Sequence, residues 1–355
     1  ILLGVGMLDM VLDIGKMAGR RVAGGAAGPA IIGSGIVASI MGQAVSNVVL
    51  TGRLTIPMMR KYGYRGSMAG AIEATASTAG QIMPPVMGLA AFIIASFLNR
   101  AYIDVALSAM IPGLLYLVGV CIAVFVYAKR YDLPKLKEAV DTTRIKRMMP
   151  TFLISFGVVL WMLLGYRSPA IAGMWGIGLA VVLAMFQGKF RPTRRQMYEA
   201  IEEGFYLVAI LSLLLIAVGP LGQVMLTTNL SGRLGSALIQ YLPDTQLILL
   251  IGAMVVSLIL GMGLPTPVAY IIVALALVPF MQQIGIPPLQ AHFFVFYFAV
   301  FSTLTPPVAV SVLAAAKLAD ASFLDTAKDS LKIAMTTFII PFAFVFSPEL
   351  MSFPD

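Results

Sequence analysis

The sequence predicts an all-α polytopic membrane protein whose two halves are related by an internal repeat. Three observations support this class. The chain of 355 residues is 59% hydrophobic and only 11% charged, whereas a soluble domain carries about 25% charged residues. Its mean hydropathy is +0.94. Finally, a proline pair interrupts one apolar segment at Pro84-Pro85 and recurs at Pro306-Pro307, 222 positions later (84 + 222 = 306).

The same offset relates Pro57 to Pro279 and Gly63 to Gly285. Adjacent prolines free several backbone acceptors, because proline lacks an N–H and clashes with the carbonyl one turn back. In hydrocarbon, such backbone is tolerated only where it is buried in protein or lines a cavity. Matched interruptions in two halves of a membrane chain therefore predict an inverted-repeat transporter with its binding site near the breaks.

Apolar runs measured against the roughly 20 residues that cross a bilayer define the expected spans. In chain order these are 67–98, 103–128, 150–166, 170–188, 205–226, 288–316 and 331–348. The first and sixth contain the proline pairs, so we expect two broken transmembrane helices. Regions 28–58 and 246–281 are too long for one span and have glycine- or proline-rich centres. We expect each to be a re-entrant helical hairpin with arms of about 15 residues.

These elements predict three parts of the chain. Residues 1–128 form the first repeat, and residues 205–355 form the second. Residues 129–204 hold a basic cytoplasmic loop followed by connecting or scaffold helices.

The basic residues predict the orientation and account for the net charge of +8. With loop 129–148 in the cytoplasm, alternation of the spans puts 20 of the 24 Lys and Arg residues on that side. Such a bias is the signature of a membrane orientation rather than of nucleic-acid binding. The segment Arg60 to Arg65 is then cytoplasmic, while its uncharged counterpart Gln282 to Ile286 is external. The two repeats therefore cross the membrane in opposite senses.

Neutral oxygen donors gather at the tips and breaks, and they suit a hard cation such as Na⁺. Single Ser and Thr residues often only join membrane helices, but here they cluster beside paired breaks in both repeats. The candidate Na⁺ ligands are Gly42, Ser46, Asn47, Thr78, Gly80, Gly263, Thr266, Ser302, Thr303 and Thr305.

Three isolated residues are not assigned to the candidate site: the role of Glu73 is left open, and His292 and Cys121 are given structural interpretations. Glu73 lies inside a span, where a carboxylate is costly; it either carries function, pairs with Arg53 or caps the first hairpin. His292 is the only histidine, so a zinc site built on several histidines is excluded. We expect His292 near the outer surface of the membrane. The lone Cys121 is interpreted as apolar filler.

Enzyme signatures are absent, so we expect neither catalysis nor a cofactor. The chain has no phosphate-binding loop with a lysine, no paired histidines and no nucleophile elbow. Uphill transport would then depend on an ion gradient.

Three stretches of the first half and two of the second resemble a known family. GQAVSNVVLTG at 42–52, IPMM at 56–59 and EATASTAGQIMPP at 73–85 are similar to the large membrane subunit of tripartite ATP-independent periplasmic (TRAP) transporters. GMGLPT at 261–266 and LTPPV at 304–308 resemble the second repeat of that subunit. The resemblance covers nearly the whole chain and is greatest to the fused 4TM/12TM form that works with TAXI-type receptors.

The resemblance implies a Na⁺-coupled importer of small carboxylates, of the elevator type within the ion-transporter superfamily. It implies the bacterial or archaeal cytoplasmic membrane, a periplasmic or extracellular TAXI-type solute-binding protein, and membrane lipids as surroundings. A small membrane subunit, or fused N-terminal helices that precede Ile1, is also implied. The anionic substrate would lie between the tips, near Gln43, Ser46, Asn47, Pro85 and Thr266.

The chain departs from the family at the first tip, where many members have Ser-Gly-Ser and this chain has Met41-Gly42-Gln43. No arginine lies at either tip, so helix N-termini and amides would hold a carboxylate. The alternative function is a stand-alone ion-coupled di- or tricarboxylate carrier that needs no receptor. An intramembrane enzyme or a passive channel are more distant alternatives.

Overall fold

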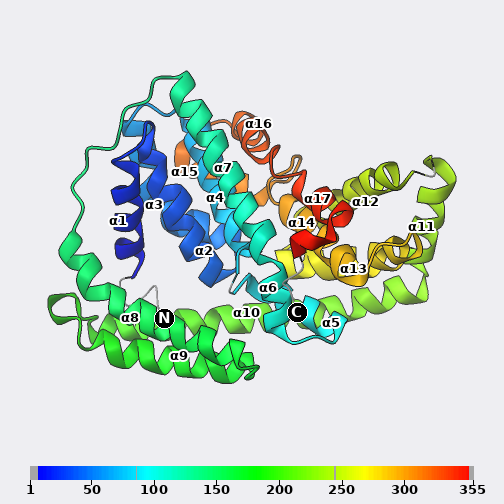
Figure 1. Cartoon of the computed structure of the whole chain (residues 1–355), viewed down its shortest axis with the longest axis horizontal. Helices are drawn as coiled ribbons and strands as arrows, with labels where there is room; N and C mark the ends of the chain where they lie inside the picture. Colours follow the sequence, from blue (N-terminus) through cyan, green and yellow to red (C-terminus); the bar gives the residue numbers. More distant parts are fainter. Residues whose placement is uncertain (1–6, 85, 244, 352–355) are drawn as a thin grey trace.

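The computed structural model describes residues 7–84, 86–243 and 245–351, and these ranges contain helices without any β-strand (Figure 1). The first half holds α1 (Leu8–Gly19), η2 (Gly25–Ala27), η3 (Pro29–Ser34), α2 (Gly35–Met41), α3 (Ala44–Lys61), α4 (Gly66–Ile82), α5 (Gly88–Leu98), α6 (Tyr102–Ser108) and α7 (Met110–Arg130). The middle holds α8 (Thr142–Leu164), α9 (Pro169–Ala184), η4 (Gly188–Phe190) and α10 (Arg194–Thr227). The last part holds α11 (Leu230–Tyr241), α12 (Gln246–Gly261), α13 (Thr266–Gln283), α14 (Pro288–Phe301), α15 (Val310–Ala319), α16 (Phe323–Ala334), α17 (Ile340–Phe346) and η5 (Pro348–Met351).

The offset of 222 residues recurs in the helix bounds. Helix α3 begins at 44 and ends at 61, and α13 begins at 266 and ends at 283 (44 + 222 = 266; 61 + 222 = 283). Helices α4 and α14 begin at equivalent positions (66 + 222 = 288), and so do α5 and α15 (88 + 222 = 310). The residues before α5 and α15 also match, since Met87 and Ala309 both have positive φ angles, of 50° and 39°. The two halves thus share a backbone plan.

Each predicted hairpin centre is a short helix break. Gly42 and Gln43 separate α2 from α3, and residues 262–265 separate α12 from α13. Gly42 and Gly263 have φ angles of +66° and +75°, a left-handed conformation that glycine adopts without steric cost. The arms α3 and α13 have 18 residues each, somewhat longer than predicted.

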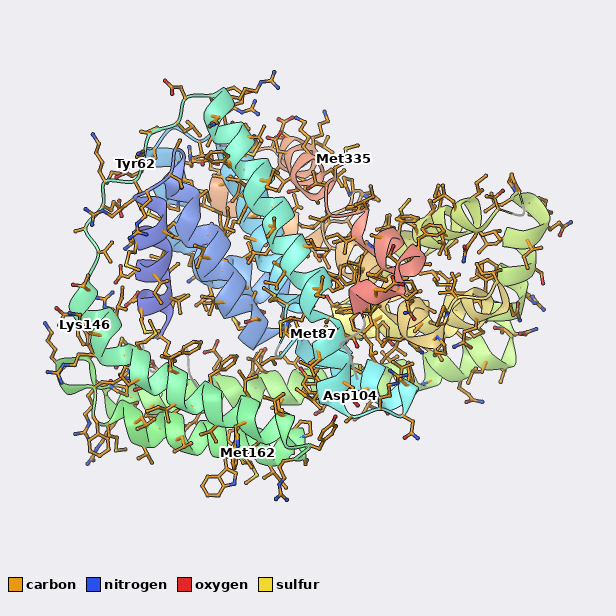
Figure 2. The ribbon with its side chains drawn as sticks, viewed as in Figure 1. Tyr62, Met87, Asp104, Lys146, Met162 and Met335 are labelled. Carbon is orange, nitrogen blue, oxygen red and sulfur yellow. The ribbon has the colours of Figure 1, made fainter. Side chains whose placement is uncertain are left out.

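The proline pairs break the helices as expected. Helix α4 ends at Ile82 and α5 begins at Gly88, while α14 ends at Phe301 and α15 begins at Val310. Met87, which follows the first pair, is buried near the middle of the molecule (Figure 2).

Three predicted spans were wrong in extent. Region 331–348 is two helices, α16 and α17, because Thr336 and Thr337 hydrogen-bond back to carbonyls and Pro341 cannot continue a helix. Region 103–128 is divided between α6 and α7. Helix α10 begins well before 205, because Thr193 and Gln196 form a capping box that starts it at Arg194.

Helices α8, α9 and α10 form a layer along one edge of the molecule, and Met162 lies in it (Figures 1 and 2). Among the described helices, α7, α8, α10 and α13 are long and apolar enough to cross a membrane, and the α5–α6 pair, bent by 114°, would make a fifth. Large apolar side chains on this layer are exposed, including Trp161 and Phe186. Such exposure fits contact with lipid tails, which are as apolar as leucine.

Candidate functional site

A cavity of about 330 Å³ lies where the two helix breaks at the hairpin centres meet. The first break and its following turn supply Gln43, Ala44, Val45 and Ser46, and the second supplies Gly263, Leu264, Pro265, Thr266 and Pro267. The remaining wall consists of Gln81, Thr303, Val310 and Ser311. No described lining residue carries a charge, so any ligand specificity here rests on amides, hydroxyls and backbone groups.

Three helix N-termini converge on this cavity. Residues 44–46 are the first turn of α3, 266–267 begin α13, and 310–311 begin α15. None of the three has a side-chain hydrogen bond at its N-cap residue. The first N–H groups of a helix lack intrahelical partners and carry partial positive charge. The cavity wall is therefore suited to an anion even though no arginine or lysine lines it.

Gln81 connects the two halves of the molecule. Its Nε2 donates to Thr266 Oγ1 at 2.8 Å and to Gly42 O at 3.3 Å. Its Oε1 is buried and has no hydrogen-bond partner among the described residues, and the same is true of Ser311 Oγ. Buried polar atoms are nearly always paired, so these two oxygens are available to a bound ion or solute.

The structure brings five of the predicted residues to the cavity, namely Gln43, Ser46, Gly263, Thr266 and Thr303. Ser46 Oγ donates to Gln43 Oε1 at 3.1 Å, which fixes the amide at the first break. The predicted Pro85 lies outside the described residues.

The other predicted residues of the first half lie behind the cavity wall. Gly42 contacts Gly88, and a Cβ on Gly80 would clash with Ala38 and Ser39. Thr78 Oγ1 donates to Ala74 O at 2.8 Å within its own helix. Asn47 is fully buried, and its Oδ1 has no partner among the described residues.

In the second half, Ser302 and Thr305 also lie behind the wall. Ser302 Oγ donates to Gly261 O at 2.9 Å, joining α14 to the end of α12. Thr305 Oγ1 donates to Phe301 O at 2.9 Å. Thr303 O accepts from Ser311 N at 3.2 Å, which holds the broken helix against the start of α15.

Sequence reasoning missed Gln81 and Ser311. Gln81 stands three residues before Pro84, and Ser311 stands four residues after Pro307. Their closeness to the proline pairs was the available signal. Which way such a side chain points depends on the rotation of a helix near its broken end, which periodicity does not give.

Glu73 and His292 are both buried, and neither lies at the cavity. Arg53 is exposed, and among the described residues Glu73 forms no ion pair. His292 Nδ1 lies 2.7 Å from Tyr270 Oη, inside the protein. A Glu73–Arg53 pair is therefore absent among the described residues. His292 is held by a buried partner, Tyr270, and its place near the outer surface of the membrane stays a prediction.

Long apolar helices, paired helix breaks and an uncharged cavity between them define a multi-pass membrane transporter component. Residues 1–352 match the family described as the tripartite ATP-independent periplasmic transporter, DctM component. The chain belongs to this family, which consists of large permeases rather than enzymes and places it in the cytoplasmic membrane.

Curated relatives agree with the family. The sialic acid TRAP transporter permease of Haemophilus influenzae is 21% identical over 98% of this chain and 56% of the relative. The 2,3-diketo-L-gulonate TRAP transporter large permease of Escherichia coli is 24% identical over 98% of this chain and 82% of the relative. The C4-dicarboxylate TRAP transporter large permease of Vibrio cholerae is 22% identical over 94% of this chain and 79% of the relative.

Proposed function

We propose that this chain is the transmembrane subunit of a secondary active importer that takes small organic acids from a solute-binding protein. The convergence of three helix N-termini on an uncharged cavity carries this proposal. A carboxylate placed there would accept hydrogen bonds from first-turn backbone N–H groups of α3 and from Thr266 N of α13, since Ser311 N of α15 already donates to Thr303 O. It would also interact favourably with the three helix dipoles. The names of the relatives, which include a sialic acid and a C4-dicarboxylate permease, support the same substrate class.

Na⁺ is the proposed coupling ion, and it belongs to the transported cargo. Buried oxygens that have no hydrogen-bond partner in the described part of the chain support it, because a hard cation is bound by neutral oxygens as well as by carboxylates. These are Asn47 Oδ1 behind the first tip, and Gln81 Oε1 and Ser311 Oγ at the cavity. The remaining proposed ion ligands would be carbonyls at Gly42, Gly80 and Gly263 and hydroxyls at Ser46, Thr78, Thr266, Ser302, Thr303 and Thr305.

The proposed partners are a TAXI-type solute-binding protein and a small membrane subunit or equivalent fused helices. The exposed apolar layer of α8, α9 and α10 is a surface on which further membrane helices would pack. The proposed mechanism is an elevator motion that moves the cavity across the membrane. The two hairpins would re-enter from opposite faces in this arrangement.

Uptake by proteoliposomes tests the proposal. The chain is reconstituted with its small subunit and supplied with receptor, loaded with the receptor's own ligand, under an inward Na⁺ gradient. Import is expected only when receptor and gradient are both present. Gln81→Leu, which removes the amide that joins the cavity walls, is expected to abolish import, whereas Gln187→Leu, behind α8, is the matched control that retains it.

Two outcomes would contradict the proposal. Import of free ligand without receptor would identify a stand-alone carrier. Import that does not saturate and does not respond to removal of Na⁺ would identify a passive pathway.

A further inference from the structure

A buried network of hydroxyl groups surrounds the carboxylate of Glu73. Its Oε1 accepts from Ser34 Oγ at 2.7 Å, from Thr51 Oγ1 at 2.5 Å and from Ser77 Oγ at 3.2 Å. Its Oε2 accepts from Thr55 Oγ1. Asn47 Nδ2 extends the network by donating to Ser77 Oγ at 2.8 Å. All six side chains, Thr55 included, are enclosed by protein and have no exposed surface.

No charged group balances this carboxylate within the described residues. The elements packed against α4 are α2, α3, α7, α14, α15, α16 and η3. Helices α2 and η3 carry no titratable side chain. The titratable side chains of the others are Arg53, Arg60, Lys61, Tyr116, Cys121, Tyr127, Lys129, Arg130, His292, Tyr297, Lys317, Asp325, Lys328, Asp329 and Lys332. None of these forms a hydrogen bond or an ion pair with Glu73. Tyr116 Oη donates to Thr75 O, and Asp329 pairs with Arg65 and Lys332.

The second repeat shows that the architecture does not require this network. Adding the offset of 222 to Ser34, Asn47, Thr51, Thr55, Glu73 and Ser77 gives Val256, Ala269, Val273, Leu277, Val295 and Ala299. All six equivalents are apolar, yet α12, α13 and α14 pack together in the same way that η3, α3 and α4 do. At these six positions the equivalent helices therefore pack through apolar side chains, and their polar contacts lie elsewhere, at Tyr270–His292 and Ser302–Gly261. The six polar side chains of the first repeat serve a purpose other than packing.

The network accommodates two charge states without moving its heavy atoms. Thr51 Oγ1 lies 2.8 Å from Asn47 O, and Thr55 Oγ1 lies 3.1 Å from Thr51 O. Each hydroxyl thus has one acceptor on Glu73 and a second on its own helix. When Glu73 is ionised, both threonines donate to it. When Glu73 carries a proton, that proton is donated to a threonine oxygen, and the threonine hydrogen turns to the carbonyl.

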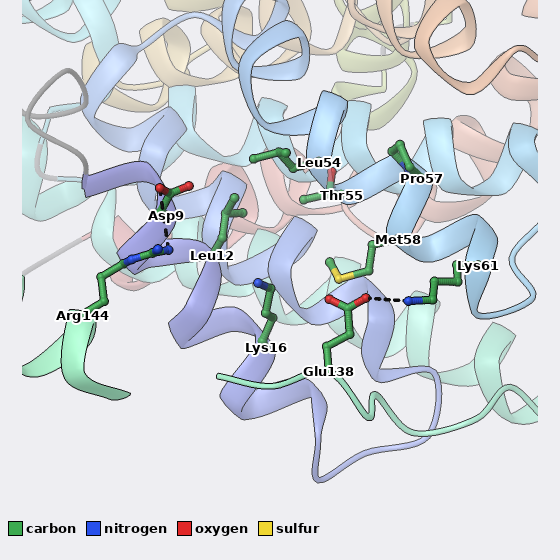
Figure 3. Close-up of a pocket in the computed structure, with 10 residues that line it drawn as sticks. All are labelled: Asp9, Leu12, Lys16, Leu54, Thr55, Pro57, Met58, Lys61, Glu138 and Arg144. Carbon is green, nitrogen blue, oxygen red and sulfur yellow. Dashed lines mark hydrogen bonds and ion pairs between the residues drawn. The ribbon is translucent and has the colours of Figure 1, made fainter. Parts of the chain in front are cut away.

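Thr55 also forms part of a cavity of about 370 Å³ (Figure 3). Charged side chains line it, namely Asp9, Lys16, Lys61, Glu138 and Arg144, and the Lys61–Glu138 and Arg144–Asp9 pairs are drawn there. A cavity so lined is suited to water. It lies on the side of the molecule that the basic residues assign to the cytoplasm.

We propose that Glu73 is a proton-binding site that exchanges its proton with this charged cavity through the hydroxyl of Thr55. A hydronium ion in the cavity gives a proton to Thr55 Oγ1 and becomes water, while the hydroxyl's own proton passes to Glu73 Oε2. One O–H bond breaks and one forms at Thr55, so its hydroxyl is unchanged, and the net result is one proton taken from the cavity. Release runs in reverse. Hydroxyl donors occupy both carboxylate oxygens at hydrogen-bond distance, and no cluster of three His, Cys, Asp or Glu exists among the described residues, so the site takes a proton rather than a multivalent metal ion.

Infrared difference spectroscopy on the purified full chain tests the site without receptor, substrate or ion gradient. Its result is therefore separate from the fate of the proposed function. A protonated carboxylic acid has a carbonyl band distinct from that of a carboxylate, and the band shifts when the proton is replaced by deuterium. We expect a pH-dependent band that is lost in Glu73→Gln. In Thr55→Val the band is expected to remain but to exchange more slowly, and Thr55→Ser is expected to restore the rate.

Glu138→Gln is the matched control, because it removes a carboxylate at the rim of the same cavity and should leave the band and its exchange unchanged. A band that survives Glu73→Gln, or the lack of any such band in the wild type, would overturn the proposal. Exchange in Thr55→Val at the rate of the wild type would overturn it equally, and this comparison stands even if Glu73→Gln does not fold.

Discussion

Gly80 and Ser302 occupy equivalent positions (80 + 222 = 302), and so do Ser39 and Gly261 (39 + 222 = 261). In the first repeat the glycine is on the broken helix, close to Ala38 and the backbone of Ser39, while in the second the glycine ends α12 and lies close to the Ser302 side chain. In both repeats a glycine thus leaves room for the helix that it faces. The close approach of each broken helix to its hairpin therefore depends on a glycine, placed on the broken helix in the first repeat and on the hairpin in the second.

Gly80→Val is expected to destabilise the protein, because a Cβ there would clash with the backbone and side chain of Ala38 and with Ser39. Overpacking of this kind costs about 1–3 kcal/mol or more. The apparent thermal unfolding temperature in detergent should fall, and Na⁺-dependent uptake should be lost. Gly178→Val in α9 is the matched control, since a Cβ at Gly178 meets nothing within 4 Å. Equal stability of the two variants would contradict this account.

The hydrogen bond from Gln81 to Thr266 is expected to couple the two repeats energetically. Gln81→Leu, Thr266→Val and the double variant form a double-mutant cycle. A buried neutral hydrogen bond contributes a net stabilisation of about 1 kcal/mol, so the two substitutions should be non-additive by about that amount in unfolding experiments. Strictly additive effects would mean that the bond contributes nothing across the repeat boundary.

The sequence predicted where this site lies better than it predicted which residues line it. Hydroxyl and glycine residues near the tips were identified, and Gln43, Ser46, Gly263, Thr266 and Thr303 line the cavity. Gln81 and Ser311 were missed, while Thr78 and Thr305 bond only to their own helices. A residue type and a position near a break do not determine whether a hydroxyl faces a cavity or a carbonyl one turn back.

At the scale of the element, proline and glycine positions determined most of the helix breaks that could be predicted. Both proline pairs and both tips are breaks in the structure. The division of 331–348 could not be foreseen from hydropathy, because it depends on Thr336 and Thr337 bonding to carbonyls. The early start of α10 depends likewise on a capping box in a polar stretch. Hydropathy locates apolar length, whereas these boundaries depend on individual hydrogen bonds.

The start of α8 is expected to depend on pH. Asp141 accepts from Thr143 N and Arg144 N, both at 3.0 Å. The backbone hydrogen bond from Arg144 is the largest of the interactions that hold the pKa of Asp141 below its usual range. Because the folded pKa is depressed, the stabilisation is present above the unfolded pKa of about 3.9 and is lost as the pH falls through the folded pKa.

Hydrogen exchange of the Thr143 and Arg144 amides measures this effect. After correction for intrinsic exchange, protection should decrease in acid for the wild type. Asp141→Asn should retain protection in acid, since its amide oxygen still caps the helix, and Asp141→Ala should lack it at every pH. Protection independent of residue 141 would show that the cap does not order the first turn.

At the scale of the whole molecule, charge and repeat have different roles. The repeat places two breaks and two tips around one cavity, while the basic residues orient the chain in the bilayer. The first repeat also carries the polar network of Glu73, which the second replaces with apolar side chains. The molecule is therefore symmetric in backbone and asymmetric in chemistry. Such asymmetry lets one half bind a proton while both halves share the substrate cavity.

The opposite orientation of the two repeats is the prediction on which the whole arrangement depends. Lys61 and Gln283 end α3 and α13 at equivalent positions (61 + 222 = 283), and both are exposed. An inverted repeat places them on opposite sides of the membrane, whereas a parallel repeat places them on the same side. Replacing the single Cys121 with alanine gives a background without thiols. Into it, Lys61→Cys and Gln283→Cys are introduced separately.

A membrane-impermeant maleimide applied to intact cells is expected to label the cysteine at 283 and to reach the cysteine at 61 only after permeabilisation. Lys137→Cys, in the basic loop, is the control for the cytoplasmic side and should follow the pattern of position 61. Labelling of 61 and 283 from the same side would exclude the inverted repeat. In that case equivalent helix N-termini would enter the cavity in the same direction, so the cavity would be reached from one face only. Alternating access by an elevator motion would then lose its structural basis.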